Sequence, residues 1–144
     1  MRTVKDILQE KGSDVYSISP DAKVYEALQL MADKNVGALM VMKGDQAVGL
    51  ISERDYARKI VLKGKFSKDV PVGEIMSVDI IRIDPEEDVE GCMELMTDKR
   101  VRHLPVFEED RLIGIISIGD IVKTIIRHKE EIIAQLEDYI RGRR

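Results

Sequence analysis

The stretch GLISERD, at residues 49–55, decides the fold because it returns as GIISIGD at residues 114–120. Asp55 and Asp120 end the two copies and are 120 − 55 = 65 residues apart. The same register runs without a gap back to a proline that precedes each half, and most identical pairs in it are apolar core positions. One structural unit is therefore duplicated. We expect two like halves that face each other, with these two stretches, the seam segments, between them.

The composition is that of a globular chain and excludes several classes of function. The 144 residues are 44% hydrophobic and 35% charged, which indicates one ordinary domain or two very small ones that share a core. The net charge is 23 − 27 = −4, and there is no Trp, so neither a basic patch nor an aromatic platform for nucleic acid is expected. No apolar run is long enough to span a membrane.

The compartment is predicted from cysteine usage and from the first residues. Cys92 is the single cysteine, which fits a reducing compartment. The sequence MRTVKD at its start lacks the charged-then-apolar pattern of a signal peptide. We therefore expect a cytoplasmic protein.

Hydrophobic periodicity predicts the order strand–helix–strand–strand–helix in each half, after a short helical lead-in at 4–9. In the first half the expected strands are 15–18, 39–42 and 47–51, and the expected helices are 24–34 and 55–62. In the second half they are strands 80–83, 104–107 and 112–116, helix 89–99, and a helix that opens at Ser117.

The last helix carries an apolar stripe that continues to Ile140 without Pro or Gly. Such a stripe is too long for a small domain to bury alone. Two alternatives stay open at this point. Either the end of the helix packs on a second subunit or another protein, or it folds back over its own domain.

Each seam segment has the pattern Gly-hydrophobic-hydrophobic-Ser-x-x-Asp at a junction of strand and helix. Backbone N–H groups and the helix dipole at such a junction favour an anionic or polar ligand, and the Asp carboxylate suits the diol of a ribose. The same Ser-x-x-Asp spacing is also a helix-capping pattern, and a single copy is more typical of a cap. The duplication favours a paired site without deciding between the two.

No catalytic or metal constellation emerges from the sequence. Ser117, His103 and Asp120 contain the side chains of a hydrolase triad, but the first half has no histidine at the matching position, Ala38. There is no Gly-x-Ser-x-Gly elbow, Walker loop or Gly-x-Gly-x-x-Gly run, and two histidines and one cysteine give no metal-ligand spacing. Cys92 matches Ala27 and is interpreted as a core residue. We therefore expect no enzyme and no metal site.

The chain resembles tandem CBS-domain modules, and in particular small stand-alone CBS-pair proteins. The motifs that carry the resemblance are the seam segments, VGALMV at 36–41, VRHLPV at 101–106, the strand leads VYSISPD at 15–21 and IIRIDPE at 80–86, and SERDYARK at 52–59. The resemblance implies an α+β fold of two β-α-β-β-α repeats, packed sheet to sheet with pseudo-two-fold symmetry, plus an extended C-terminal helix. The expected parts are repeat 1 at 1–62, a linker at 63–71, repeat 2 at 72–127 and a helical extension at 128–144.

The resemblance also implies clefts that hold adenosine compounds as regulatory ligands: AMP, ADP, ATP, NAD(H) or S-adenosylmethionine. One cleft would combine Ser117 and Asp120 with Ser13, Asp14 and Val15 and with Val36, Gly37 and Ala38. The other would combine Ser52, Arg54 and Asp55 with Val78, Asp79 and Ile80 and with Arg102 and His103, while Ile51 and Ile116 precede the seam serines. Arg102 and His103 suit phosphate, and Arg58, Lys59, Lys63 and Lys65 lie near enough in sequence to reach a polyphosphate tail.

The resulting hypothesis is a regulatory sensor that binds an adenosine compound, forms a homodimer and acts on a protein partner, with no role for nucleic acid or membrane. The alternative is a scaffold for dimerisation or interaction that holds no ligand.

Overall fold

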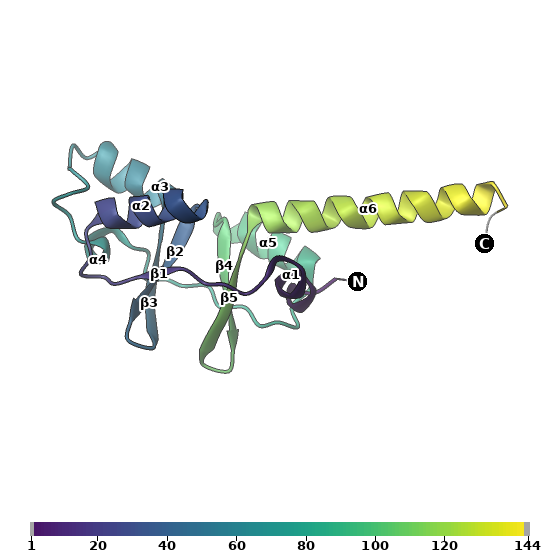
Figure 1. Ribbon diagram of the computed structural model, residues 1–144, viewed down its shortest axis with the longest axis horizontal. Coiled ribbons are helices and arrows are strands. Elements are labelled where there is room, and N and C mark those ends of the chain that lie inside the picture. Colours follow the sequence, from purple (N-terminus) through teal and green to yellow (C-terminus); the bar gives the residue numbers. More distant parts are fainter. Residues whose placement is uncertain (1, 143–144) are drawn as a thin grey trace. The chain divides into compact units, whose positions relative to one another are not determined.

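Each half of the chain builds a β-hairpin that runs directly into a helix (Figure 1). The computed structural model describes residues 2–142. The elements in chain order are α1 (Val4–Lys11), β1 (Ser17–Ile18), α2 (Val24–Lys34), β2 (Ala38–Lys43), β3 (Gln46–Ser52), α3 (Glu53–Tyr56), the π-helical turn η1 (Ala57–Val61), α4 (Val72–Ile75), α5 (Val89–Lys99), β4 (His103–Glu108), β5 (Arg111–Ser117) and α6 (Ile118–Ile140).

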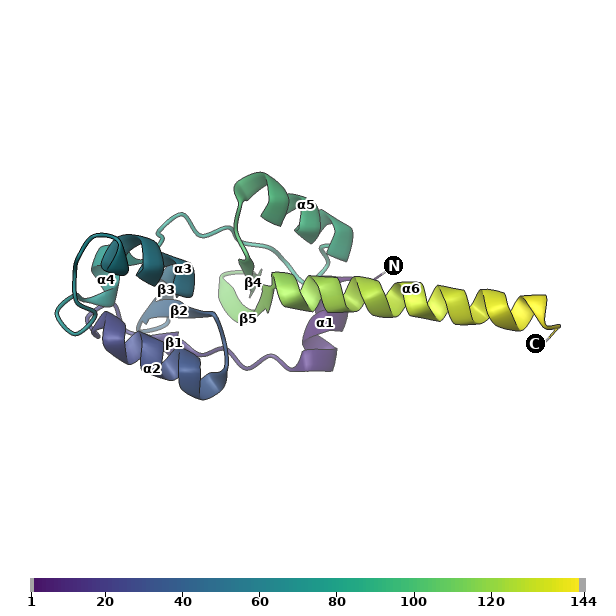
Figure 2. The same cartoon turned by 90° about the horizontal axis from the view of Figure 1, so that it is seen from above.

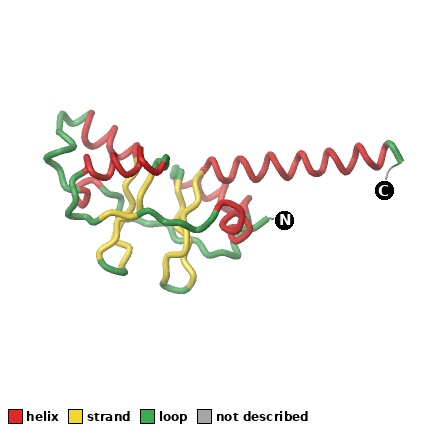
Figure 3. Tube along the Cα trace, viewed as in Figure 1, coloured by secondary structure: helices red, strands yellow, loops and turns green. Residues whose placement is uncertain are grey.

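The two hairpins share their register and even their irregularity. β2 pairs antiparallel with β3, and β4 with β5, so that Met40 faces Leu50 and Pro105 faces Ile115. Each pairing shifts register at equivalent places, after Val41 in one and after Val106 in the other. Figure 3 shows both hairpins in yellow, each followed by a helix in red. The duplication seen in the sequence is therefore a duplication of structure.

The leading strand differs between the halves. β1 pairs parallel with β2 through Ser17 and Ile18. In the second half the predicted strand 80–83 is wrong, because only Ile83 pairs, in a single parallel bridge to Val106. The chain before it turns sharply where the N–H of Ile80 donates to the carbonyl of Val78. The turn keeps these residues out of a continuous ladder.

Two further differences concern helices. Helix α4, at Val72–Ile75, lies in a stretch for which no helix was predicted. The helix expected at 55–62 begins earlier, at Glu53, and widens into the π-helical turn η1 from Ala57. The other predicted helices are confirmed, and α2 and α5 have the predicted bounds.

The structure divides into two compact units, residues 14–82 and residues 2–13 together with 83–142. In unit 14–82, the core consists of α2, β2 and β3 side chains closed by residues from the stretch around α4. Its buried members are Val24, Ala27, Met31, Leu39, Val41, Ile51, Ile60, Val70, Val72 and Ile75.

Each compact unit takes its lead-in helix from outside its own hairpin repeat. In one unit the N–H of Val72 donates to the carbonyl of Ala22 at 2.8 Å. In the other, the N–H of Val4 donates to the carbonyl of Glu87 at 2.9 Å. Ala22 and Glu87 are equivalent in the duplication, so α1 and α4 are equivalent lead-ins. The helix that opens the chain thus serves the second repeat, and α4 serves the first.

The seam glycines provide the space for these lead-in helices. A Cβ on Gly114 would lie 2.6 Å from a methyl of Leu8 on α1, and a Cβ on Gly49 would lie 2.6 Å from the sulfur of Met76, which follows α4. Both distances are shorter than any real contact between such atoms. The glycine of each seam segment is therefore explained by helix packing.

Helix α6 begins within its own unit and then continues beyond it (Figures 1 and 2). Ile121 and Thr124 are buried, whereas every residue from His128 to Gly142 is exposed. Two ion pairs hold the helix to the start of the chain: Glu10 on α1 pairs with Arg127, and Arg2, just before α1, pairs with Glu131. Of the two alternatives for this helix, folding back over its own unit is excluded for the described residues.

Candidate functional site

The Ser and Asp of each seam segment form a capping box at the start of the following helix. The N–H of Ser52 donates to Oδ2 of Asp55 at 2.9 Å, and the N–H of Asp55 donates to the Ser52 hydroxyl at 3.3 Å. Ser117 and Asp120 repeat the arrangement at 2.8 and 3.2 Å. Both aspartates therefore satisfy helix N–H groups, as the capping alternative requires. The two sites differ in the other contacts that each aspartate carboxylate makes and in how exposed it is.

Asp55 has both carboxylate oxygens engaged and is 8% exposed. Oδ2 closes the capping box, while Oδ1 lies 3.2 Å from Nζ of Lys59 and 3.5 Å from the hydroxyl of Ser77. Lys59 also donates to the carbonyl of Ile75 at 2.8 Å. This carboxylate is thus tied to its own helix and to the end of α4.

Asp120 is more open. Its Oδ2 accepts from the Ser117 backbone and, at 2.7 Å, from Nζ of Lys11, which also donates to the carbonyl of Ile115. Among residues 2–142, no hydrogen bond reaches its Oδ1, and its side chain is 22% exposed compared with 11% for Asp55. One oxygen of Asp120 therefore remains available to a polar ligand.

In the Asp120 site, the surroundings favour an ionised Asp120 carboxylate and a neutral His103 imidazole. Burial raises the pKa of Asp120, but hydrogen bonds from Lys11 and from Ser117 outweigh burial and hold the pKa below its ordinary value. Burial also lowers the pKa of His103. Asp120 raises it, and the positive charges of Lys11 and Arg102 lower it further. At neutral pH the site presents a carboxylate, an ammonium group and a neutral imidazole.

The strand before each seam segment contributes equivalent residues to its own site. Ala38 faces Ser52 across one hairpin, and His103 faces Ser117 across the other. The carbonyl of Gly37 accepts from the first N–H of α3 at 3.0 Å, and the carbonyl of Arg102 accepts from the first N–H of α6 at 2.8 Å. His103 and Arg102 therefore lie in the unit of Asp120, whereas Asp55 belongs to the other unit.

The remaining predicted site residues lie in three kinds of place. Ile51 and Ile116 are fully buried, so they offer a ligand only backbone groups. Val78 and Asp79 are exposed directly after Ser77, and Ile80 is half-buried. Ser13 and Asp14 are exposed in the stretch after α1, Val15 and Val36 are half-buried, and Arg54 lies half-buried within α3.

Two polar side chains at these sites, Lys11 and Ser77, were not among the predicted binding residues. Lys59, predicted only as a possible contact for a polyphosphate tail, lies 3.2 Å from Oδ1 of Asp55. Lys59 stands four residues after Asp55 on one helical face, a spacing that the sequence does show. Lys11 reaches Asp120 from 109 positions away, and Ser77 reaches Asp55 only because α4 packs on the first hairpin. No pattern of neighbouring residues in the sequence predicts these two contacts.

The sites are suited to binding and not to nucleophilic catalysis. The Ser117 hydroxyl accepts the N–H of Asp120, and the Asp120 carboxylate is held by the helix and Lys11, which is not the order of a Ser-His-Asp relay. Cys92 is fully buried, and burial raises the pKa of its thiol to about 12, with Glu87 and Asp88 adding to the effect. Within residues 2–142 there is no cluster of metal-ligating side chains.

The family model described as "CBS domain" matches residues 4–62 and 72–127, and the chain belongs to this family as a CBS-domain pair. It is 40% identical to the CBS domain-containing protein CBSX3, mitochondrial, of Arabidopsis thaliana, over 97% of this chain and 72% of that protein. The resemblance to small stand-alone CBS-pair proteins is thereby confirmed. The cytoplasmic location stays a prediction. No helix within the described part of the chain has the length and apolar character needed to cross a membrane.

Solved structures give the same fold. A protein with CBS domains from Burkholderia ambifaria superimposes with a TM-score of 0.86 at 46% identity, over 88% of this chain and 95% of that one. The CBS domain pair of protein MJ0100, in complex with 5-methylthioadenosine and S-adenosyl-L-methionine, has a TM-score of 0.76 at 23% identity, over 87% and 96% of the two chains. The α+β fold of two β-α-β-β-α repeats with a long terminal helix is confirmed.

Proposed function

We propose that this chain is a regulatory module that binds an adenosine compound and that Asp120 provides the ribose-binding carboxylate. The observation that carries the proposal is the free Oδ1 of Asp120 on an ionised, partly exposed carboxylate. Two adjacent hydroxyls of a ribose can donate to such a group. The seam segment of the first repeat is the weaker candidate because both oxygens of Asp55 are already engaged.

The neighbours of Asp120 fit a ligand that carries phosphate or another anion. Nζ of Lys11 lies 2.7 Å from the carboxylate, and Arg102 and His103 lie at the start of the adjacent strand. Arginine and lysine bind phosphate by charge-assisted hydrogen bonds. AMP, ADP, ATP and NAD(H) are therefore the first compounds to test, with S-adenosylmethionine as the sulfonium-containing alternative.

The regulatory part of the proposal follows from linkage. A ligand changes the state of a module only if it binds two arrangements with different affinity. We infer that occupancy is read by a protein partner or through a homodimer, in which the exposed apolar face of α6 is covered.

The test is calorimetric titration of the chain with each of the five compounds, repeated on Asp120→Asn. The asparagine keeps an oxygen for the capping box and removes the charge. A hydrogen bond to a charged group is worth about 1.5–3 kcal/mol, so the affinity should fall roughly 10- to 100-fold. Asp6→Asn is the matched control, because Asp6 closes the same box with Thr3 on α1. Equal affinity of Asp120→Asn and the parent chain contradicts the assignment.

The second candidate is a scaffold that holds no ligand, and the two capping boxes favour it. In that case Asp55 and Asp120 only stabilise helix ends. The absence of heat and of any shift in melting temperature with all five compounds would support the scaffold.

A further inference from the structure

We propose that the exposed face of α6 pairs with the same face of a second copy of this chain, antiparallel and in one defined register. This inference is independent of ligand binding.

The apolar residues of α6 recur with the spacing of a coiled coil. From Val122 the seam positions follow at alternating intervals of four and three residues: Val122, Ile126, Lys129, Ile133, Leu136 and Ile140. The five apolar members are between 44% and 80% exposed. A repeat of this kind places all six side chains along one side of a helix.

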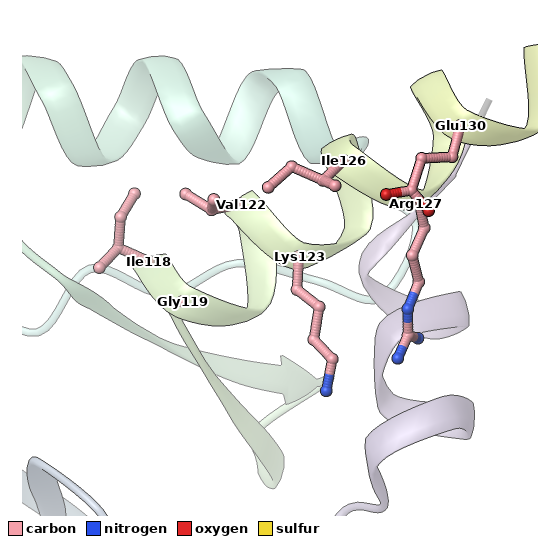
Figure 4. A pocket seen from close by; sticks show the side chains of 7 residues that line it. All are labelled: Ile118, Gly119, Val122, Lys123, Ile126, Arg127 and Glu130. Carbon is pink, nitrogen blue, oxygen red and sulfur yellow. The ribbon is translucent and has the colours of Figure 1, made fainter. Parts of the chain in front are cut away.

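α5 of the same unit packs on α6, yet each of the five apolar seam residues keeps 44% or more of its surface exposed. Arg127 pairs with Glu10 on α1, Glu131 pairs with Arg2 just before α1, and Ile121 and Thr124 are buried. These residues occupy the opposite and lateral faces of the helix. Figure 4 shows Ile118, Val122 and Ile126 on one side of α6, with Lys123 and Arg127 turned away from it. These five residues, with Gly119 and Glu130, line an open hollow on the surface.

The charges of α6 are divided between its halves, and this division selects the orientation. Residues 118–129 carry Lys123, Arg127, Lys129 and Asp120, a net charge of 3 − 1 = +2. Residues 130–140 carry four acidic groups and no basic one, a net charge of −4. An antiparallel pair places the basic half of each helix against the acidic half of the other. A parallel pair would align like charges and place the two Lys129 side chains in one layer.

Matching the seam positions fixes the register. Ile126 pairs with Leu136 of the partner subunit, and Val122 with Ile140 of the partner subunit, so the two-fold axis passes near residue 131. Lys123 then flanks Glu137 of the partner subunit. No ion pair within residues 2–142 uses either of these two side chains. On the other flank, Ile132 meets Ile132 of the partner subunit. The paired stretch is ~27 Å long at about 1.5 Å per residue.

Disulfide trapping tests this register and does not depend on whether other surfaces also associate. The background is Cys92→Ala, chosen because Ala27 occupies the equivalent position in the first repeat. Single cysteines are introduced as Ile132→Cys, Ile140→Cys and Val122→Cys, with Gln135→Cys, on the opposite face, as the control. A disulfide needs Cα atoms within about 7 Å.

The expected result has two parts. Ile132→Cys forms a homodimeric disulfide under mild oxidation, whereas Ile140→Cys alone remains at the level of Gln135→Cys, since its two copies are ~27 Å apart at about 1.5 Å per residue. A mixture of Ile140→Cys and Val122→Cys gives the mixed disulfide. A homodimeric disulfide of Ile140→Cys indicates parallel helices and overturns the proposal, as does cross-linking of all variants at the level of Gln135→Cys.

Discussion

At the scale of single residues, the two halves show where equivalent positions have diverged. In the two hairpin turns, Gly44 has φ +64° and its counterpart Glu109 has φ +58°. Glycine adopts this left-handed conformation without a steric penalty, whereas other residues generally pay about 1–2 kcal/mol. Glu109 is exposed and its side chain points into no core. The second hairpin therefore contains local strain that the first lacks.

We expect Glu109→Gly to stabilise the chain by up to about 1 kcal/mol, because relief of the left-handed strain exceeds the entropy that glycine adds to the unfolded chain. Urea unfolding with Gly44→Glu as the reciprocal variant checks this. A decrease in stability for Glu109→Gly, or an increase for Gly44→Glu, contradicts the interpretation.

His103 predicts how stability depends on pH. Burial lowers its pKa in the folded chain below the ordinary value of about 6.5, so the unfolded chain takes up the proton first. The stability gained by keeping His103 neutral is fully present above about pH 6.5, and it is lost as the pH falls through the pKa that His103 has in the folded chain. His103→Gln should flatten the dependence of unfolding free energy on pH between about 7.5 and 5.5. His128→Gln, at an exposed position of α6, is the control for the loss of an imidazole.

Cys92 should resist alkylation. Its thiol is fully buried, and its pKa is raised to about 12, so almost no thiolate exists at pH 8. Iodoacetamide is expected to label the native chain slowly and the urea-unfolded chain rapidly, as mass spectrometry can record. Rapid labelling of the native protein would show that this part of α5 opens readily.

At the scale of elements, the helices and hairpins could be predicted from hydrophobic periodicity, and the duplication fixed most of their limits. The strand at 80–83 could not be excluded in this way, because its apolar residues resemble those of 15–18. Whether such a segment pairs depends on the turn at Ile80. α4 was missed because four residues are too few to show a period.

The candidate sites were predictable only in part. Ser52, Asp55, Ser117 and Asp120 follow from the repeated pattern, and so does their capping role. The difference between the two carboxylates depends on which lead-in helix reaches each of them. Lys11 on α1 corresponds to Asp79 after α4, so the lead-in of the first repeat brings no cation to Asp55, whose ion-pair partner is Lys59, four residues further along the chain. That contrast requires the tertiary structure.

The contact between α1 and the second hairpin gives a test at this scale. Gly114→Ala should cost about 1–3 kcal/mol, because the new methyl would overlap Leu8 at 2.6 Å. Leu8→Ala should cost stability by leaving a cavity, and the double variant should be more stable than the sum of the two losses predicts. Additive losses in urea unfolding would show that Gly114 and Leu8 are not coupled.

At the scale of the whole molecule, the repeats defined by sequence and the compact units defined by packing are not the same segments. Val72 and Ile75 complete the core of unit 14–82, although they follow the first repeat in the chain. A fragment of residues 14–82 should therefore show a more cooperative thermal transition than a fragment of residues 1–71. Circular dichroism of both fragments makes the comparison, and a better-folded 1–71 would contradict the observed packing.

Because α1 packs on the second repeat and α4 on the first, the order in which the chain folds is also constrained. α1 is synthesised before any of its partners, and β5, on which it packs, follows roughly a hundred residues later. During that interval the apolar face formed by Val4, Ile7 and Leu8 has no permanent neighbour. Contacts of such long sequence separation form late and slow the search for the native state. A nascent chain that stalls before the second hairpin would leave this apolar face of α1 accessible to chaperones and proteases.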